Sequence, residues 1–229
     1  MWEKTDILII LLGGKSIRFN ESLPKQFLPF REGQVLFEYT TGKLLRNMAF
    51  QKVVFSVFSD YIKLPVFTQA FHRLQNEFAI TFSICEGGES RHHSFINAIE
   101  LLSQDPDDSV LCIHDANRPH LTKSFLQRAD QVKNTIDQTI PCAIPVIPAT
   151  DSLCLQENGM VTEYIDREAC GLVQTPQFLH LGSLKEALKS IHSRNFTDEG
   201  SLMIQMGFRV ITYEGDRENK KITFREDLL

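Results

Sequence analysis

Short apolar runs of strand length alternate with longer amphipathic segments along most of the chain. A continuous apolar run over residues 7–12 stops at a glycine pair, which predicts a central strand that enters a loop. Similar runs predict strands over residues 53–58, 80–85, 110–114, 140–147, 210–213 and 222–224. Apolar residues at three- and four-residue spacing predict helices over residues 35–48, 94–102, 121–133 and 183–191, with a shorter one over 200–206. Strands separated by helices indicate an α/β fold with a mostly parallel sheet and helices on both faces.

One segment breaks this alternation. Residues 152–155 and 160–164 are two short strand-like runs on either side of Asn158-Gly159, a dipeptide typical of a tight two-residue turn. A bare two-stranded hairpin is only marginally stable in water. We therefore expect this hairpin to pack on another surface, either a second subunit or its own domain. Without repeats or linker-like stretches elsewhere, the sequence predicts one domain over residues 1–229 with a hairpin arm at about 149–168.

Composition limits the classes of function. The chain has 229 residues, 42% hydrophobic and 23% charged, which is typical of a soluble globular protein. Its net charge of −5 argues against a broad surface for nucleic acid or for an anionic membrane. The N-terminus lacks the basic start of a signal peptide, and no apolar stretch is long enough to span a membrane. We therefore expect a cytoplasmic protein with no nucleic-acid or membrane partner.

Most of the five cysteines are expected to be small buried apolar residues rather than metal ligands or redox partners. Their number is odd, they are widely spaced and no C-x-x-C pair occurs. They are Cys85, Cys112, Cys142, Cys154 and Cys170. This usage is consistent with a reducing compartment.

The loop after the first predicted strand carries the first candidate chemistry. Residues 13–16 (GGKS) resemble the end of a P-loop, but the glycine which that motif requires five residues before Gly14 is Ile9. What remains is a glycine-bearing turn followed by three cations within eleven residues, Lys15, Arg18 and Lys25. Backbone N–H groups and cations of this kind suit a triphosphate. On its own, the segment is equally consistent with a solvated basic loop.

Further short blocks follow this loop in a fixed order. In chain order the blocks are residues 11–19 and 24–28 (LLGGKSIRF and PKQFL), 87–94 (GGESRHHS), 114–119 (HDANRP), 166–167 and 174–178 (DR and QTPQF), 197–201 (TDEGS), and 214–216 and 219–223 (EGD and NKKIT). This ordered series resembles the 2-C-methyl-D-erythritol 4-phosphate cytidylyltransferase family. The resemblance extends over nearly the whole chain.

The resemblance implies a Rossmann-like domain that transfers CMP from CTP to the phosphate of a small polyol, with release of pyrophosphate. It implies that Arg18, Lys25 and Lys221 are catalytic, because they would hold the triphosphate and the charge that grows at the α-phosphoryl group. Asp115, at the end of a predicted strand, is the implied ligand of Mg²⁺. The residues implied to bind CTP are Leu12, Gly13, Gly14, Gly87, Gly88, Ser94 and Ala116.

A second set of residues is implied for the polyol phosphate. The set is Arg118, Thr150, Ser152, Arg167 and Thr197. In the family an arginine comes from the hairpin arm of the partner subunit, so the resemblance implies a homodimer formed through that arm, with Arg167 in this role. Whether Thr150 or Ser152 faces the substrate stays open.

Departures from the family pattern leave the substrate less defined than the reaction. Ser16 replaces a glycine, Asn117 an alanine and Lys220 an apolar residue. The family's acceptor is 2-C-methyl-D-erythritol 4-phosphate, used in isoprenoid precursor biosynthesis. A ribitol 5-phosphate cytidylyltransferase resembles the same template, whereas a sugar-1-phosphate nucleotidyltransferase matches it less well. A catalytically silent nucleotide-binding regulator is the alternative from another class, and the retained charged residues argue against it.

Overall fold

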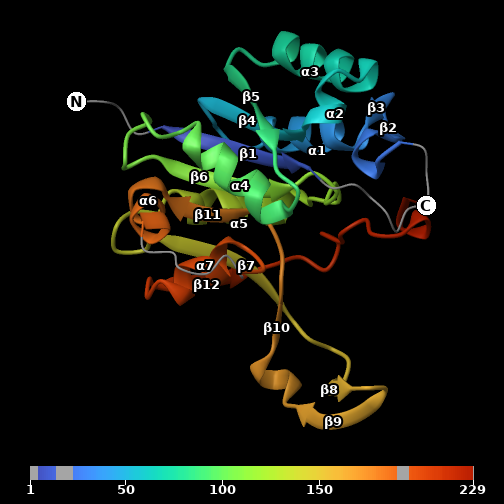
Figure 1. Ribbon diagram of the computed structural model, residues 1–229, viewed down its shortest axis with the longest axis vertical. Helices are drawn as coiled ribbons and strands as arrows, with labels where there is room; N and C mark the ends of the chain where they lie inside the picture. The colour runs from blue at the N-terminus through green and yellow to red at the C-terminus, as the bar shows by residue number, and fades with distance from the viewer. Residues whose placement is uncertain (1–4, 14–22, 190–195, 229) are drawn as a thin grey trace.

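The computed structural model describes residues 5–13, 23–189 and 196–228. Within these ranges, eight strands form one sheet in the order β10-β7-β11-β6-β1-β4-β5, with β12 paired to β7 (Figure 1). The strands of this sheet are β1 (Asp6–Leu12), β4 (Lys52–Phe58), β5 (Thr81–Gly87), β6 (Val110–Asp115), β7 (Cys142–Pro148), β10 (Gly171–Val173), β11 (Gln177–His180) and β12 (Val210–Glu214). A small separate sheet pairs β2 (Pro29–Arg31) with β3 (Gln34–Val35).

The sheet is mostly parallel. Strands β6, β1, β4 and β5 run in one direction, and β12 is parallel to β7. Strand β11 is antiparallel to both β6 and β7, and β10 is antiparallel to β7. The predicted α/β class with a mostly parallel sheet is confirmed, and the two reversed strands make the sheet mixed.

Helices cover both faces of the sheet, as predicted. The helices are α1 (Leu36–Leu45), α2 (Ser59–Ile62), α3 (Pro65–Glu77), α4 (Arg91–Glu100), α5 (Lys123–Lys133), α6 (Leu181–Lys189) and α7 (Glu199–Gln205), with short 3₁₀ turns η2 (Lys25–Phe27), η3 (Arg167–Ala169) and η4 (Arg225–Leu228). Alternate residues of β1 point into two separate apolar cores, which is the period-two pattern of a buried strand. Helices α1, α3 and α5 close one core, and α4, α6 and α7 close the other.

Most predicted elements are confirmed, with one error and several omissions. The strand predicted over residues 222–224 is wrong, because this stretch is a loop held by the buried Ile222 side chain. Helices α2 and α3 and strands β2, β3, β10 and β11 were not predicted. The predicted helix over residues 183–191 is α6, and residues 190 and 191 lie outside the described residues.

The predicted hairpin is present as β8 (Leu153–Glu157) paired with β9 (Met160–Ile165). Asn158 and Gly159 turn the chain with positive φ angles of 50° and 79°, which the Asn-Gly dipeptide tolerates. The hairpin stands away from the main sheet, below β10 in Figure 1. Its apolar side chains are exposed, with Met160 at 67% and Tyr164 at 74% of their full accessible surface. The hairpin is therefore an arm whose apolar side chains are not covered by the body of the same chain.

Candidate active site

Four parallel strands end at the same edge of the sheet and bring three of the sequence blocks together. Leu12 pairs in register with Val57 of β4, and Leu11 of β1 pairs with Asp115 of β6. Phe58 pairs with Gly87, the last residue of β5. Since ligands of open α/β sheets bind outside the carboxyl ends of the strands, this edge is the expected location of the site. We call it the sheet edge.

Two glycine-bearing loops pack closely over Ser94 at the sheet edge. The Ser94 hydroxyl is buried, accepts a hydrogen bond from the Gly88 N–H at 3.1 Å and donates to the Ser90 carbonyl at 2.9 Å. A Cβ atom on Gly13 would lie 2.5 Å from the Ser94 Oγ, and one on Gly87 would lie 3.2 Å from it. Ser94, predicted as a CTP contact, thus holds the shape of the loop that starts at Gly87.

Asp115 lies at the centre of a cluster of cations. Its carboxylate accepts from Lys221 Nζ at 2.9 Å, from Arg91 Nε at 3.4 Å and from Arg118 Nε at 3.5 Å. Burial alone would raise the pKa of Asp115, but the charges of Arg91, Lys221 and Arg118 outweigh it and hold that pKa well below its usual range. The structure therefore joins three residues predicted for different roles, Asp115, Arg118 and Lys221, in one network.

Arg91 links this cluster to the start of α7. Its guanidinium donates two hydrogen bonds to Glu199, with Nη1 to Oε1 at 2.7 Å and Nη2 to Oε2 at 2.9 Å. Glu199 is fully buried. Burial would lower the pKa of Arg91, but the carboxylates of Glu199 and Asp115 raise it above its ordinary value. Neither Arg91 nor Glu199 was predicted as a site residue, although Arg91 lies in the GGESRHHS block and Glu199 in the TDEGS block.

Lys25 is placed by two anchors beside it in the chain. The Phe27 ring is buried against Phe37 and Tyr61, with ring centroids 5.7 and 5.4 Å apart. Gln26 Nε2 donates to the Leu12 carbonyl at 3.0 Å. With its neighbours fixed in this way, Lys25 Nζ donates to the Ile222 carbonyl at 2.7 Å.

Asn117 ties the segment that carries Lys221 to the sheet edge. Its side-chain amide donates to the Ile222 carbonyl at 2.8 Å, and its own carbonyl accepts from the Ile222 N–H at 2.9 Å. Arg118 Nη1 donates to the Asn219 carbonyl at 3.0 Å. The departure from the family pattern at Asn117 therefore supports the position of the NKKIT block.

His114 holds the backbone on both sides of Asp115. A carbonyl can only accept, so Nε2 carries the proton and donates to the Arg118 carbonyl at 3.1 Å. Nδ1 then accepts from the Thr175 hydroxyl at 2.9 Å, and the same hydroxyl accepts from the Asp115 N–H at 3.2 Å. Burial lowers the pKa of His114 to about 4, which favours this neutral form.

The residues predicted for the polyol phosphate do not all come together in one chain. Arg167 Nη1 donates to the Thr150 carbonyl at 3.0 Å, so these two meet at the base of the arm, near the exposed Ser152. Thr197 is exposed just before α7, and its N–H donates to the Ser201 hydroxyl at 3.0 Å. Only Arg118 of this set belongs to the cation cluster around Asp115. The hairpin of β8 and β9 lies apart from the main sheet in Figure 1.

The remaining predicted residues are placed as follows. Ala116 is buried, and its carbonyl accepts from Thr40 Oγ1 at 2.9 Å. A Cβ atom on Gly88 would clash with the Cβ of His93. Gly14 and Arg18 lie outside the described residues.

The described residues offer one predicted metal ligand. No group of three or more His, Cys, Asp or Glu side chains within them is arranged to hold a metal ion. Asp115 supplies a hard oxygen ligand at the sheet edge, and in the part of the chain that the structure describes its Oδ1 atom accepts from Arg91 Nε at 3.4 Å. This donor fits Mg²⁺ of the kind that takes one protein carboxylate and completes its shell with phosphates and water.

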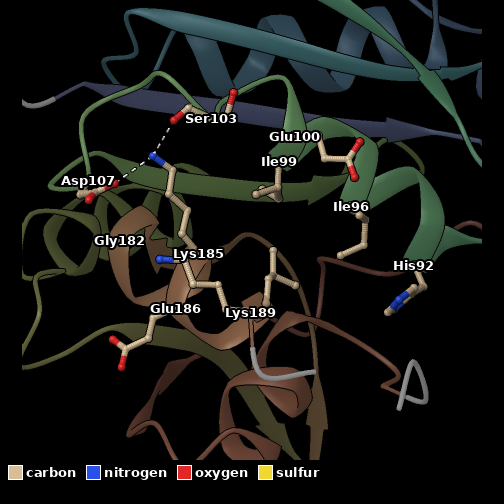
Figure 2. Close-up of a pocket in the computed structure, with 11 residues that line it drawn as sticks. His92, Ile96, Ile99, Glu100, Ser103, Asp107, Gly182, Lys185, Glu186 and Lys189 are labelled. Atoms are coloured by element: carbon tan, nitrogen blue, oxygen red, sulfur yellow. Dashed lines mark hydrogen bonds and ion pairs between the residues drawn. The ribbon is translucent and has the colours of Figure 1, made fainter. Parts of the chain in front are cut away.

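A cavity of about 870 Å³ lies between α4 and α6 (Figure 2). Ile96, Ile99 and Leu188 line it together with charged residues, and Lys185 Nζ is held there by Asp107 at 2.8 Å. It contains none of the residues predicted for the active site. Among the described residues, the chemistry anticipated from the sequence therefore lies at the sheet edge and on the arm.

Comparison with known proteins agrees with this arrangement. The profile of the family described as 2-C-methyl-D-erythritol 4-phosphate cytidylyltransferase matches residues 7–229. A protein of that name from Thermosipho africanus is 31% identical over 223 residues, which cover 96% of this chain and 93% of the relative. One from Phocaeicola vulgatus is 32% identical over 225 residues, with coverage of 96% and 95%.

Solved structures show the same fold. The crystal structure of 2-C-methyl-D-erythritol 4-phosphate cytidylyltransferase from Francisella tularensis superimposes with a TM-score of 0.76 at 23% identity and covers 98% of this chain and 97% of its own. At this identity the likeness establishes the fold alone. Within the described ranges, no helix reaches the length and hydropathy of a membrane span.

Proposed function

This chain belongs to the 2-C-methyl-D-erythritol 4-phosphate cytidylyltransferase family, and we propose that its active site is the sheet edge around Asp115. The chain transfers CMP from CTP to 2-C-methyl-D-erythritol 4-phosphate, which gives 4-diphosphocytidyl-2-C-methyl-D-erythritol and pyrophosphate. The observation that carries the location is the cluster of Lys221, Arg91 and Arg118 on a single buried carboxylate.

The reaction joins two anions, so the protein's main task is to neutralise and align them. A phosphate oxygen of the polyol phosphate attacks the α-phosphorus of CTP, and the bond from that phosphorus to the bridging oxygen breaks as pyrophosphate leaves. Lys25 and Lys221 reach the sheet edge from the two ends of the chain. We assign them, with Arg18, to the charge that grows on the α-phosphoryl oxygens.

The nucleotide is proposed to lie over the two glycine loops. Gly13 and Gly87 leave room for backbone close to Ser94, which brings the N–H groups of this region toward the open edge. Leu12, Gly88 and Ala116 are assigned to the same CTP site, and Gly14, which lies outside the described residues, is assigned to it from the sequence. We assign Ser94 to positioning of the CTP loop, since its hydroxyl is bonded to Gly88 and Ser90.

Asp115 is the residue proposed to hold Mg²⁺. The ion supplies neutralisation of the triphosphate when it is bound. Arg91, Arg118 and Lys221 already compensate the Asp115 charge in this structure, and they keep its carboxylate ionised across the physiological pH range. A hard metal ion requires an ionised carboxylate oxygen as its ligand.

We propose a homodimer in which the arm of each subunit completes the site of the other. The exposed apolar side chains of the hairpin favour burial against a second copy, since an isolated two-stranded hairpin is marginal. Arg167 and Thr150 would then meet the polyol phosphate from the partner, while Arg118 and Thr197 approach from the subunit that binds CTP. Ser152 lies on the same arm, and the choice between it and Thr150 stays open.

A cytoplasmic location is also proposed. All five cysteines are free. Only Cys112 and Cys142 are buried, whereas Cys85 and Cys170 are half-buried and Cys154 is exposed, so the expectation that most are buried is wrong. Unpaired cysteines are usual where thiols are kept reduced.

A pyrophosphate-release assay tests the function. CTP, UTP, ATP and GTP are each combined with 2-C-methyl-D-erythritol 4-phosphate or ribitol 5-phosphate, with and without Mg²⁺. We expect release with CTP and 2-C-methyl-D-erythritol 4-phosphate in the presence of the metal. A preference for ribitol 5-phosphate would indicate a ribitol 5-phosphate cytidylyltransferase. No pyrophosphate release in any combination would favour a regulator that only binds nucleotide.

A further inference from the structure

Arg91 stands where three segments of the site meet. It is the first residue of α4, its guanidinium holds Glu199 at the start of α7, and its Nε atom faces Asp115 at the end of β6. We propose that Arg91 and Glu199 are a positioning pair that fixes the CTP loop and the polyol-phosphate segment relative to each other. The inference rests on the function proposed above.

The CTP side of the pair is rigidly connected to Arg91. Ser90 caps α4 by accepting a hydrogen bond from the His93 N–H at 3.1 Å, and Ser94 bonds both Ser90 and Gly88. The loop and the first turn of α4 are therefore one hydrogen-bonded unit. A displacement of Arg91 is transmitted to the backbone of Gly87 and Gly88.

The polyol-phosphate side is connected to Glu199 in the same way. Asp198 caps α7 by accepting from the Ser201 N–H at 2.8 Å, and Thr197 bonds the Ser201 hydroxyl. Gln177 holds this turn from β11, since its Nε2 donates to Asp198 Oδ2 at 2.9 Å and its Oε1 accepts from the Gly200 N–H at 3.0 Å. Thr197 therefore moves with Glu199.

The pair is costly to bury, and its geometry satisfies both charges. A buried carboxylate without a partner is strongly unfavourable, whereas Glu199 has both oxygens bonded to the two terminal nitrogens of Arg91. The third guanidinium nitrogen, Nε, remains for Asp115. The planar guanidinium of Arg91 thus bonds the carboxylates of both Glu199 and Asp115, which the ammonium of a lysine cannot do in the same geometry.

Two substitutions separate the two sides of this connection. In Glu199→Gln, the amide keeps the shape but removes the charge that holds the start of α7, so the KM for the polyol phosphate should rise about tenfold or more while the Kd for CTP changes less than about threefold. In Arg91→Lys, the bridge to both carboxylates is lost. The KM values for both substrates should therefore rise.

The chain provides a matched control in the pair Arg73 and Glu38. Glu38 is also fully buried, and Arg73 donates to its two oxygens at 2.6 and 2.8 Å, but neither contacts the sheet-edge cluster in any described interaction. Glu38→Gln should lower the melting temperature to a similar extent as Glu199→Gln. It should leave both KM values and kcat unchanged.

The experiment is steady-state kinetics, CTP titration calorimetry and thermal melting on wild type and all three variants. If wild type forms no product from CTP and 2-C-methyl-D-erythritol 4-phosphate, the proposed function fails. If wild type is active but Glu199→Gln and Arg91→Lys keep wild-type kinetic constants and differ only in melting temperature, the positioning role is wrong. The same holds if Glu38→Gln shifts the KM for the polyol phosphate as much as Glu199→Gln does.

A failure of Glu199→Gln to fold does not remove the test. The double variant Arg91→Gln/Glu199→Gln replaces the ion pair by two amides of similar shape that can bond to each other. Its KM for the polyol phosphate should still exceed the wild-type value about tenfold, because the connection to Asp115 is weakened. Wild-type constants in this variant would overturn the proposal.

Discussion

The sheet edge and the arm carry residues of the same proposed site, but they are organised in opposite ways. At the edge, Asp115 has three cationic partners, and the Lys25 ammonium is bonded to the Ile222 carbonyl. On the arm, the described structure shows one bond for the Arg167 guanidinium, to the Thr150 carbonyl. The polar groups of the edge are held by contacts within one chain, whereas the apolar side chains of the arm are exposed in this chain.

This difference has a physical basis in the two local folds. The edge is made of strand ends and glycine loops between two apolar cores, so its polar groups are positioned before substrate arrives. The arm is a two-stranded hairpin with its apolar side chains in solvent. In the proposed function, charge stabilisation is therefore preorganised within a subunit, while recognition of the second substrate depends on the proposed dimer.

Removal of a cation from the edge is expected to have the largest effect. In Lys221→Ala, the charge that Asp115 now holds at 2.9 Å is lost from the position proposed to stabilise the transition state. We expect kcat to fall about 100-fold or more, the usual cost of one such contact. The measurement is steady-state pyrophosphate release at saturating substrates.

Lys220→Ala is the matched control for this variant. Lys220 is the exposed neighbour of Lys221, and none of its side-chain atoms is bonded to Asp115 in the described structure. Its removal changes the net charge by the same amount, and kcat should stay within about threefold of wild type. Near-normal turnover in Lys221→Ala, or an equal loss in both variants, would remove Lys221 from the catalytic set.

Removal of Arg167, the cation on the arm, is expected to have a smaller effect, on KM rather than on kcat. Arg167→Ala should raise the KM for the polyol phosphate about tenfold or more, as loss of a hydrogen bond to a charged group does, with little change in the KM for CTP. A 1:1 mixture with Lys25→Ala, after subunit exchange, should regain activity corresponding to about a quarter of the sites, because each heterodimer holds one intact site.

The mixing experiment distinguishes a shared site from one built within a subunit. Exchange is verified by mass spectrometry of the mixed dimers, and Glu168→Ala, one residue further along the arm, serves as control. No recovery of activity in verified heterodimers would place Arg167 and Lys25 in the same subunit's site. If the protein is monomeric at the assay concentration, a site shared between two subunits is likewise ruled out.

The same contrast explains what could be predicted from the sequence. The edge strands were found because β1 and β6 are apolar runs that stop at glycine or aspartate, and because β4 is apolar except for Ser56. The arm was found because Asn158-Gly159 marks a turn by local chemistry alone. Each of these signals is carried by a few consecutive residues of the chain.

What was missed depends on contacts between distant residues. Strand β11 was overlooked because its four residues form a strand through pairing with β6 and β7 rather than through a pattern of their own. The predicted strand over residues 222–224 has strand-like composition, but its backbone is bonded to Asn117 instead of a neighbouring strand. Arg91 and Glu199 are 108 residues apart, and no local pattern connects them.

Acid should lower the stability of the sheet edge more than that of the arm. This loss of stability is the smallest of the effects predicted here. The folded-state pKa of His114 is about 4, below the ordinary value of 6.5, so the unfolded chain binds the proton more readily. The stability that neutral His114 contributes is complete above pH 6.5 and is lost as the pH falls toward 4. Between pH 7.5 and 5.5 the loss is about 1.3 kcal/mol, or about 3–5 °C in melting temperature.

Thermal melts in metal-free buffer at these two pH values test this expectation. His114→Gln keeps a donor for the Arg118 carbonyl but has no imidazole to protonate. The difference between its melting temperatures at pH 7.5 and 5.5 should therefore be smaller than that of wild type by about 3–5 °C. His72→Gln, at an exposed histidine on α3, should keep the wild-type difference. Equal pH responses in wild type and His114→Gln would show that the imidazole is not what makes the edge sensitive to acid. The edge would then differ from the arm through the ion pairs of Asp115 and not through the protonation of His114.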